Sequence, residues 1–541
     1  MERFFNTAGP QQVDIHYTID PLTRFDLDDM LMLIRQRKYF VLHAPRQTGK
    51  TSCMLALRDL LNQQGDYIAV YANVEGGQAS RDNVQSVVKS TVDVITHETE
   101  MIVGDTFPRG VRDSVQGEGH DSMLSTYLSK LSMALPKPLV LIIDEIDALV
   151  GDSLISVLRQ IRSGYANRPA SFPNSIILCG VRDVRDYRIQ TSGKDIVTGG
   201  SAFNIKSESL RLGNFTQNEV HALYMQHTEE TGQHFDEACF PLLWLATEGQ
   251  PWLVNAVGYE VTMKMKENRD RSVHITPDMI ERAIENIIYR RDTHIDILID
   301  KLSEPRVKRV IEPILANSEE PDESKMSDDD IQYVKDMGLV VKERGKPLRI
   351  SNAIYREIIP RELTASTQQQ LLQQPQWYQR ADGGIDMEKL LIGFQQFYRE
   401  NSDIWISRFS YAEAGPQLLL QAFLQRIVNG GGYIDREYGL GRKRTDLLIR
   451  KPLPAAGTGP VSARQEVQRI VLELKVKRQK DGLDTLIEKG LEQTADYIDR
   501  VGSVDEGHLI IFNRDSQLSW DERIWHRPMQ HRNRPIMVWG M

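Results

Sequence analysis

A glycine–lysine–threonine sequence near the N-terminus has the residue types and spacing of a loop that binds nucleotide phosphates. The stretch from Ala44 to Thr51 matches G-x-x-x-x-G-K-[ST], except that alanine replaces the first glycine. In such a loop the backbone N–H groups and the start of the next helix face the phosphates, Lys50 supplies positive charge and the Thr51 hydroxyl can ligate Mg²⁺. We therefore predict that ATP and Mg²⁺ bind here, with nucleotide contacts from Ala44, Pro45, Arg46, Gln47, Thr48, Gly49, Lys50, Thr51 and Ser52.

An acidic pair further along the chain supplies the chemistry that hydrolysis would need. An apolar run beginning at Leu139 ends in Asp144 and Glu145. We predict that Asp144 holds Mg²⁺ through its water shell and that Glu145 polarises the attacking water. The alternative is a strand that ends in a solvated acidic turn.

Charged residues in the last third of the chain form a second candidate site. Glu413 falls in a helical pattern, Asp446 precedes an apolar strand segment, and Glu473 and Lys475 interrupt another apolar strand. Because residues two apart in a strand share a face, Glu473 and Lys475 must lie together. Burying them is costly unless they pair or bind something charged. A same-face ion pair on an edge strand is the alternative to a site.

The elements that position these residues alternate between helix and strand. An apolar run precedes the loop and an amphipathic stretch, Ser52 to Asn62, follows it, which argues against a chance match in a surface turn. Continued alternation predicts a doubly wound parallel sheet, and a second α/β domain follows a Gln-rich linker. Residues 104–120 lack a clear period and are predicted to be a loop. The predicted parts are 1–213 (core), 214–299 (helical lid), 300–362, 363–384 (linker) and 385–541.

The first part resembles the AAA-like branch of P-loop ATPases near the STAND group. The resemblance rests on the phosphate loop, the Asp-Glu strand, the strand end at Gly180-Val-Arg-Asp and a Gly-x-Pro element that opens a lid helix. It implies an additional-strand P-loop ATPase core in which Arg182 reads the terminal phosphate. It also implies that Gly249 and Pro251 contact the nucleotide and couple its state to the lid. Arg159 and Arg162 are either arginine fingers in an oligomer or solvated helix-end cations.

Residues 300–362 resemble a winged helix. Its second helix carries Asp328, Asp329, Asp330 and Asp336 against the single Lys335. These carboxylates would repel nucleic-acid phosphates, so a regulatory packing role is favoured over DNA recognition.

The C-terminal part resembles the PD-(D/E)XK nuclease family, which has a restriction-endonuclease-like fold. The order helix Glu, hairpin Asp, Glu-x-Lys and a helix bearing a glutamine carries this resemblance, with Thr445 in place of the family's proline. The resemblance implies a catalytic site whose members hold Mg²⁺ (Asp446, Glu473 and the Leu474 carbonyl), act on the attacking water (Lys475) and support the site (Glu413 and Gln493).

Composition narrows the class of protein. The 541 residues carry a net charge of -9, so contact with nucleic acid must come from a local basic patch. No apolar run is long enough to cross a bilayer, and three single cysteines suit a reducing compartment, so we expect a cytoplasmic protein.

We predict an ATPase whose nucleotide state regulates a Mg²⁺-dependent nuclease acting on nucleic acid, with DNA as the first expectation. The core could form a homo-oligomer. The alternative is a nucleotide-gated scaffold with a non-catalytic nuclease fold.

Overall fold

The computed structural model divides the chain into two compact units. The first comprises Met1–His294 with Ile331–Val341, and the second Ile295–Asp330 with Lys342–Met541. The structure describes residues 2–183, 188–190, 196–198, 203, 206–290, 301–302, 304–316, 326–359, 378–406, 420, 423–424, 433–436, 439–440, 443–444, 447–453, 467–477, 482–501, 504–513, 515 and 517–541.

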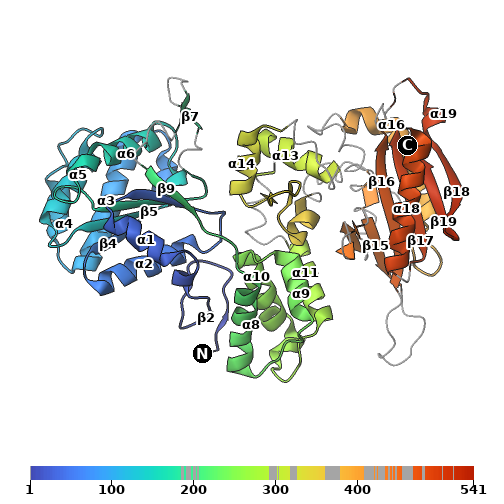
Figure 1. The fold of residues 1–541 in the computed structure, drawn as a ribbon, viewed down its shortest axis with the longest axis horizontal. Helices are drawn as coiled ribbons and strands as arrows, with labels where there is room; N and C mark the ends of the chain where they lie inside the picture. Colours follow the sequence, from blue (N-terminus) through green and yellow to red (C-terminus); the bar gives the residue numbers. More distant parts are fainter. Residues whose placement is uncertain are drawn as a thin grey trace. The chain divides into compact units, whose positions relative to one another are not determined.

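The first unit is built on a five-stranded parallel sheet with helices on both faces (Figure 1). Its strands, in sheet order, are β4 (Ile68–Asn73), β5 (Leu139–Asp144), β6 (Ser175–Gly180), β3 (Tyr39–His43) and β9 (Lys206–Arg211). Near-continuous apolar strands such as β5 suit a sheet that is covered on both sides. The predicted doubly wound parallel sheet is therefore confirmed.

Two hydrophobic cores lie on opposite faces of this sheet. One contains side chains of α1 (Leu27–Arg35) and α2 (Lys50–Gln64). The other contains side chains of α3 (Val84–Val103), α5 (Met123–Ala134) and α6 (Gly151–Ser163). The prediction of a loop over residues 104–120 is wrong in part, because α4 (Phe107–Asp113) packs its Phe107 and Val111 against the second core. Strands β7 (Arg188–Gln190) and β8 (Ile196–Thr198) pair with each other.

Helices follow residue 214 in the range 214–299, which is called the lid region below; its role as a lid stays a prediction. They are α8 (Gln217–Thr231), α9 (Cys239–Thr247), α10 (Pro251–Tyr259) and α11 (Pro277–Arg290). The sequence Thr216-Gln-Asn-Glu219 predicts a capping box, and it is present at the start of α8, with Thr216 and Glu219 bonded reciprocally. Among the described residues, no helix has the length and apolar character needed to cross a membrane.

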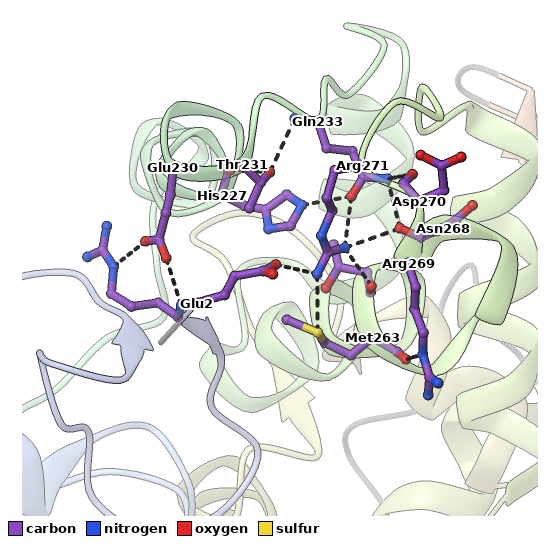
Figure 2. A network of polar contacts seen from close by, with 12 residues as sticks. Glu2, His227, Glu230, Thr231, Gln233, Met263, Asn268, Arg269, Asp270 and Arg271 are labelled. Atoms are coloured by element: carbon purple, nitrogen blue, oxygen red, sulfur yellow. Dashed lines mark hydrogen bonds and ion pairs between the residues drawn. The ribbon is translucent and has the colours of Figure 1, made fainter.

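The N-terminal segment is fastened to these lid helices. Its short strands β1 (Phe4–Phe5) and β2 (His16–Tyr17) pair in parallel. The Arg271 guanidinium donates to Gln233 Oε1, with a distance of 3.1 Å between the two atoms, and also contacts Glu2; these residues are drawn in Figure 2. Arg3 forms an ion pair with Glu230 at 2.6 Å. The first residues of the chain are thus held by charge to the lid.

Residues 300–362 contain two helices followed by a small sheet. The elements are α13 (Pro305–Ala316), α14 (Asp328–Asp336), β10 (Val340–Val341) and β11 (Arg349–Ile350), and the two strands pair. Asp329 and Asp330 of α14 form ion pairs with Arg306 of α13 at 2.9 and 3.3 Å. Two helices and a wing hairpin over Leu339 to Ile350 are what the resemblance to a winged helix predicts, and the element order agrees; assignment as a winged helix stays a prediction.

The second unit contains a six-stranded mixed sheet. Its order is β12 (Tyr433–Arg436), β15 (Leu447–Pro452), β16 (Val467–Lys477), β17 (Glu506–Asn513), β19 (Arg534–Gly540) and β18 (Trp525–His531). Side chains of α16 (Met387–Ile406) pack against one face and those of α18 (Leu483–Val501) against the other. Strands β13 (Gly439–Leu440) and β14 (Lys443–Arg444) pair separately, and α19 (Trp520–Arg523) precedes β18.

Most predicted elements of this unit are present, with one correction. The residue pattern from Leu483 to Val501 predicts a helix, which coincides with α18, and the apolar run from Arg469 to Val476 predicts a strand, which lies within β16. The sequence from His508 to Phe512 predicts a strand that closes the domain. This strand is present within β17, but it does not close the sheet, because β19 and β18 continue the sheet beyond it. Most of the helix predicted over 412–429 lies outside the described residues.

Candidate functional sites

The phosphate-binding loop joins β3 to α2, as predicted. Gln47 and Gly49 have φ angles of 58° and 93°, which turn the backbone sharply before α2 begins at Lys50. Lys50 is buried, and its ammonium group donates to the carbonyl oxygens of Ala44 and Pro45, both at 3.0 Å. The lysine charge therefore lies inside the loop on neutral acceptors, which phosphate oxygens can replace.

Asp144 sits at the carboxyl end of β5 and is fully buried. Its Oδ2 accepts hydrogen bonds from the Thr51 hydroxyl at 2.8 Å and from the Tyr71 hydroxyl at 2.6 Å. Its Oδ1 accepts the backbone N–H of Glu145 at 2.8 Å. The two predicted magnesium ligands, Thr51 and Asp144, are therefore adjacent, and a hydroxyl with a carboxylate is a donor set that Mg²⁺ accepts.

Glu145 follows Asp144 in a strained conformation. Its φ is 56°, a left-handed value that is uncommon for a residue other than glycine and that is concentrated at functional sites. Burial, and next the nearby Asp147 carboxylate, raises the pKa of Glu145. Asp147 itself accepts the backbone N–H of Val181 at 3.1 Å, which ties the end of β5 to the end of β6.

Arg182 follows β6 and contacts α14. Its guanidinium lies 3.6 Å from Asp336 Oδ2 and 4.8 Å from the centre of the Tyr333 ring. Both ionic partners are buried. A Cβ atom added at Gly338, just beyond α14, would meet the Pro45 side chain of the phosphate-binding loop at 2.8 Å. The arginine predicted to read the terminal phosphate is thus held by a carboxylate next to the loop.

A pocket beside the phosphate-binding loop is lined by three parts of the first unit. These are the N-terminal segment (Asn6, Thr7, Ala8, Gly9, Gln11, Ile19, Pro21, Arg24), the loop and start of α2 (Gln47, Thr48, Gly49, Ser52, Cys53) and the lid region (Phe215, Pro251, Trp252, Asn255). The backbone N–H of Gln11 donates to Ser52 Oγ at 3.1 Å, and Trp252 Nε1 donates to Thr7 O at 2.9 Å. The N-terminal segment therefore bridges the loop and the lid.

The Gly-x-Pro element is placed at this pocket. Pro251 is the first residue of α10 and lines the pocket. Gly249 has φ 71°, and a Cβ there would lie 2.0 Å from Phe215 O, so any larger residue would disrupt the approach of the lid backbone. The predicted roles of both residues in nucleotide contact stay predictions. Arg159 and Arg162 lie exposed on α6, which fits either alternative given for them.

The C-terminal candidate site lies on β16. Glu473 and Lys475 point to one face, where Lys475 Nζ lies 2.5 Å from Glu473 Oε1, and Glu473 is only 2% exposed. The neighbours in register on β17, Leu509 and Ile511, belong to the core that packs on α18. Leu474 packs into the opposite core. The predicted same-face arrangement is confirmed.

Other predicted members of this site are placed only in part. Gln493 is on α18, the helix that packs on the same face as Glu473, and its Oε1 is buried without a hydrogen bond from any described residue. Glu413 and Asp446 lie outside the described residues. The structure therefore brings together part of the predicted constellation.

Sequence reasoning missed two contributions to the first site. Tyr71 bonds directly to Asp144, and its only sequence signal was an aromatic residue with a polar tip near the end of a buried strand. The N-terminal residues lining the pocket, including Asn6 and Gln11, carry no periodic pattern that could have placed them there.

Comparisons with known proteins agree with the first unit's architecture. Residues 34–187 match the family model described as an AAA domain. A search of curated proteins found no match.

Solved structures of similar fold include a Walker-type ATPase of Pyrococcus abyssi (13% identity, 66% of this chain and 99% of that chain, TM-score 0.42). Cdc6p from Pyrobaculum aerophilum gives 16% identity, coverage of 63% and 93%, and a TM-score of 0.35. The RuvB Holliday junction branch migration motor of Thermotoga maritima gives 13% identity over 62% of this chain and 95% of that chain, with a TM-score of 0.31. These TM-scores lie below 0.5, so the matches are no basis for conclusions about function. On its own family match and geometry, the part of the chain from residue 34 to 187 is an AAA-type P-loop ATPase domain.

Proposed function

We propose that the protein binds and hydrolyses ATP with Mg²⁺ in its first unit, and that the state of the nucleotide regulates a Mg²⁺-dependent nuclease in its second unit. The observation that carries the first half is the bonded pair of Thr51 and Asp144 beside the loop that contains Lys50. The second half rests on the buried pair of Glu473 and Lys475. The proposed substrate is nucleic acid, in the first instance DNA.

In the proposed ATPase, each residue acts on a different part of the nucleotide. The Lys50 ammonium would exchange its two carbonyl acceptors for oxygens of the outer phosphates. Thr51 and Asp144 would hold Mg²⁺, which neutralises phosphate charge when it is bound. Glu145 would orient the attacking water, and its raised pKa suits a general base because it increases the carboxylate's affinity for a proton. The pocket that Trp252 helps to line would take the nucleoside.

Regulation would act through Arg182. A terminal phosphate near this residue would compete with Asp336 for the guanidinium, which is a charge-assisted contact in either state. Because Gly338 packs against Pro45, a change at the loop would also reach the segment that follows α14. The lid element at Gly249 and Pro251 gives a second route. We propose that the lid, the winged helix of residues 300–362 and the linker of 363–384 carry this signal.

In the proposed nuclease, Glu473 and Asp446 would hold Mg²⁺, with the Leu474 carbonyl as a further ligand. Lys475 would orient the water, and Glu413 and Gln493 would support the site. The unsatisfied oxygen of Gln493 supports this role, because a buried acceptor without a donor is costly unless something binds there.

A scaffold function is the second candidate. It is favoured by the contact between Lys475 and Glu473, because a carboxylate that is already paired with an ammonium group is satisfied without a metal. In this case the second unit would bind nucleic acid or a partner without cutting it.

Variants at the two sites test the proposal. Purified protein would be assayed for ATP hydrolysis and for cleavage of DNA and RNA, with and without ATP and Mg²⁺. We expect Glu145→Gln to stop hydrolysis and Glu473→Gln to stop cleavage while hydrolysis continues. Wild-type protein that hydrolyses ATP but cuts nothing under any condition would favour the scaffold.

The cellular setting is proposed by analogy. Fusion of an ATPase to a nuclease suits cytoplasmic defence against foreign DNA. A homo-oligomer formed through the ATPase core would let Arg159 or Arg162 serve a neighbouring site.

A further inference from the structure

Tyr71 lies one strand away from the carboxylate that would hold the metal. In the register of β4 and β5, Tyr71 is opposite Ile142, and Asn73 is opposite Asp144. Tyr71 and Ile142 belong to the same core cluster, on the face of the sheet that packs on α2. The phenol therefore reaches diagonally along the sheet to Asp144 Oδ2, at 2.6 Å.

The surroundings of Tyr71 explain its ring but not its hydroxyl group. The side chain is 9% exposed and packs among apolar residues, so a phenylalanine would fill the same space. A buried hydroxyl is costly unless it is hydrogen-bonded. Tyr39, on β3, meets this need with a backbone carbonyl, Pro173 O at 3.0 Å. Tyr71 instead uses the carboxylate of Asp144.

The hydrogen bonds to Asp144 fix both of its oxygens. Oδ1 accepts from the backbone N–H of Glu145, and Oδ2 accepts from Thr51 and Tyr71. The donor from Thr51 is the hydroxyl whose oxygen would ligate Mg²⁺, so its geometry must adjust when the metal binds. The Tyr71 hydroxyl, by contrast, is not a proposed Mg²⁺ ligand. It can therefore hold the carboxylate in place throughout.

We propose that Tyr71 is a positioning residue of the ATPase: its hydroxyl holds Asp144 in the orientation that binds Mg²⁺ together with Thr51. This inference rests on the proposed ATPase function. Loss of such an outer partner of a metal ligand typically reduces metal affinity or activity by about 10- to 100-fold.

A pair of matched substitutions tests the proposal in the full-length protein. Tyr71→Phe and Tyr39→Phe each remove one buried hydroxyl from a strand of the same sheet, but only the first touches Asp144. Binding of a fluorescent ATP analogue would be measured in EDTA and during titration with Mg²⁺, together with thermal unfolding. We expect Tyr71→Phe to raise, by about 10-fold or more, the Mg²⁺ concentration at which the effect of Mg²⁺ on binding of the ATP analogue is half-maximal. The affinity for the analogue in EDTA should be unchanged. Tyr39→Phe should change neither quantity.

A double substitution keeps the test decisive if Tyr71→Phe also lowers stability. If the hydroxyl acts through Asp144, adding Tyr71→Phe to Asp144→Asn should produce no further change in the Mg²⁺ requirement. Mg²⁺ titrations that coincide for wild type, Tyr71→Phe and Tyr39→Phe would overturn the inference while leaving the ATPase intact. Absence of nucleotide binding in the wild type would overturn the proposed ATPase itself.

Discussion

The two candidate sites handle a buried carboxylate in opposite ways. Asp144 accepts hydrogen bonds from neutral donors, namely two hydroxyl groups and a backbone N–H. Glu473 has an ammonium group at 2.5 Å. The first carboxylate is therefore prepared for a cation, whereas the second is already neutralised. The comparison teaches that burial of a carboxylate does not by itself indicate a metal site, because the charge of its partners decides what it can bind.

The sites also differ in how far apart their residues lie in the sequence. The phosphate-binding loop is contiguous, so its residues are placed by local backbone geometry. The C-terminal site needs a helix, a hairpin, a strand and a second helix, and two of its predicted members lie outside the described residues. A contiguous motif thus carries its own geometry, whereas a dispersed one depends on the whole fold.

The largest effects are expected from substitutions at the C-terminal site, which should separate metal binding from cleavage. Asp446→Ala and Glu473→Ala should abolish cleavage and weaken metal binding, since each removes a negative ligand. Lys475→Ala should also reduce cleavage, by roughly 10²- to 10³-fold, with the metal still bound. Cleavage assays and metal titration by calorimetry would check this. A fully active Glu473→Ala variant would mean that Glu473 and Lys475 form a structural ion pair and not a catalytic site.

Substitutions at the ATP site should instead separate nucleotide binding from hydrolysis. Lys50→Ala should weaken binding of the triphosphate, because it removes charge from the ground-state complex. Glu145→Gln should leave binding intact and slow hydrolysis by roughly 10²- to 10⁴-fold. Equilibrium binding and steady-state hydrolysis would measure both. Equal affinity in wild type and Lys50→Ala would contradict the assignment of the loop.

Release of Arg182 should have a moderate effect. Asp336→Asn removes its charged partner, so we expect ATP to bind about 5-fold more tightly or better. In the wild type we expect proteolysis of residues 364–384 to differ between ADP and a non-hydrolysable ATP analogue, and in Asp336→Asn we expect this difference to disappear. Asp330→Asn is the matched control, because Asp330 is on the same helix but pairs with Arg306 and Arg309. Identical behaviour of the two variants would exclude a specific role for the contact at Arg182.

The smallest expected effect is a pH dependence of stability that belongs to the first unit. His227 is fully buried, bonds to Tyr17 and Gln233, and has a pKa that burial lowers from its ordinary value of 6.5. The unfolded chain therefore takes up the proton first as pH falls, so stability is present above about pH 6.5 and is lost below it.

Thermal unfolding at about pH 7.5 and about pH 5.5 would measure this effect. We expect His227→Gln to reduce the pH-dependent loss by about 2–4 °C. His97→Gln, at an exposed position of α3, should leave the loss unchanged. A loss of the same size in His227→Gln as in wild type would show that other groups are responsible.

Strong local patterns explain what could be predicted from the sequence. The run from Tyr39 to Leu42 with the following loop, and the periodic stretch of α18, placed their elements closely. Strand β18 was missed because it is a polar edge strand that contains Pro528. Contacts between distant segments, such as Arg182 with Asp336, were missed because no local pattern specifies which partner a buried charge will meet.

The central claim is that the nucleotide in the first unit controls cleavage by the second. The most direct test measures DNA cleavage by full-length protein in Mg²⁺ with ATP, with ADP and without nucleotide, for wild type and Lys50→Ala. We predict that the cleavage rate of the wild type differs between ATP and ADP, and that Lys50→Ala cuts at one rate under all three conditions. A wild-type rate that is the same with ATP, with ADP and without nucleotide would contradict the account.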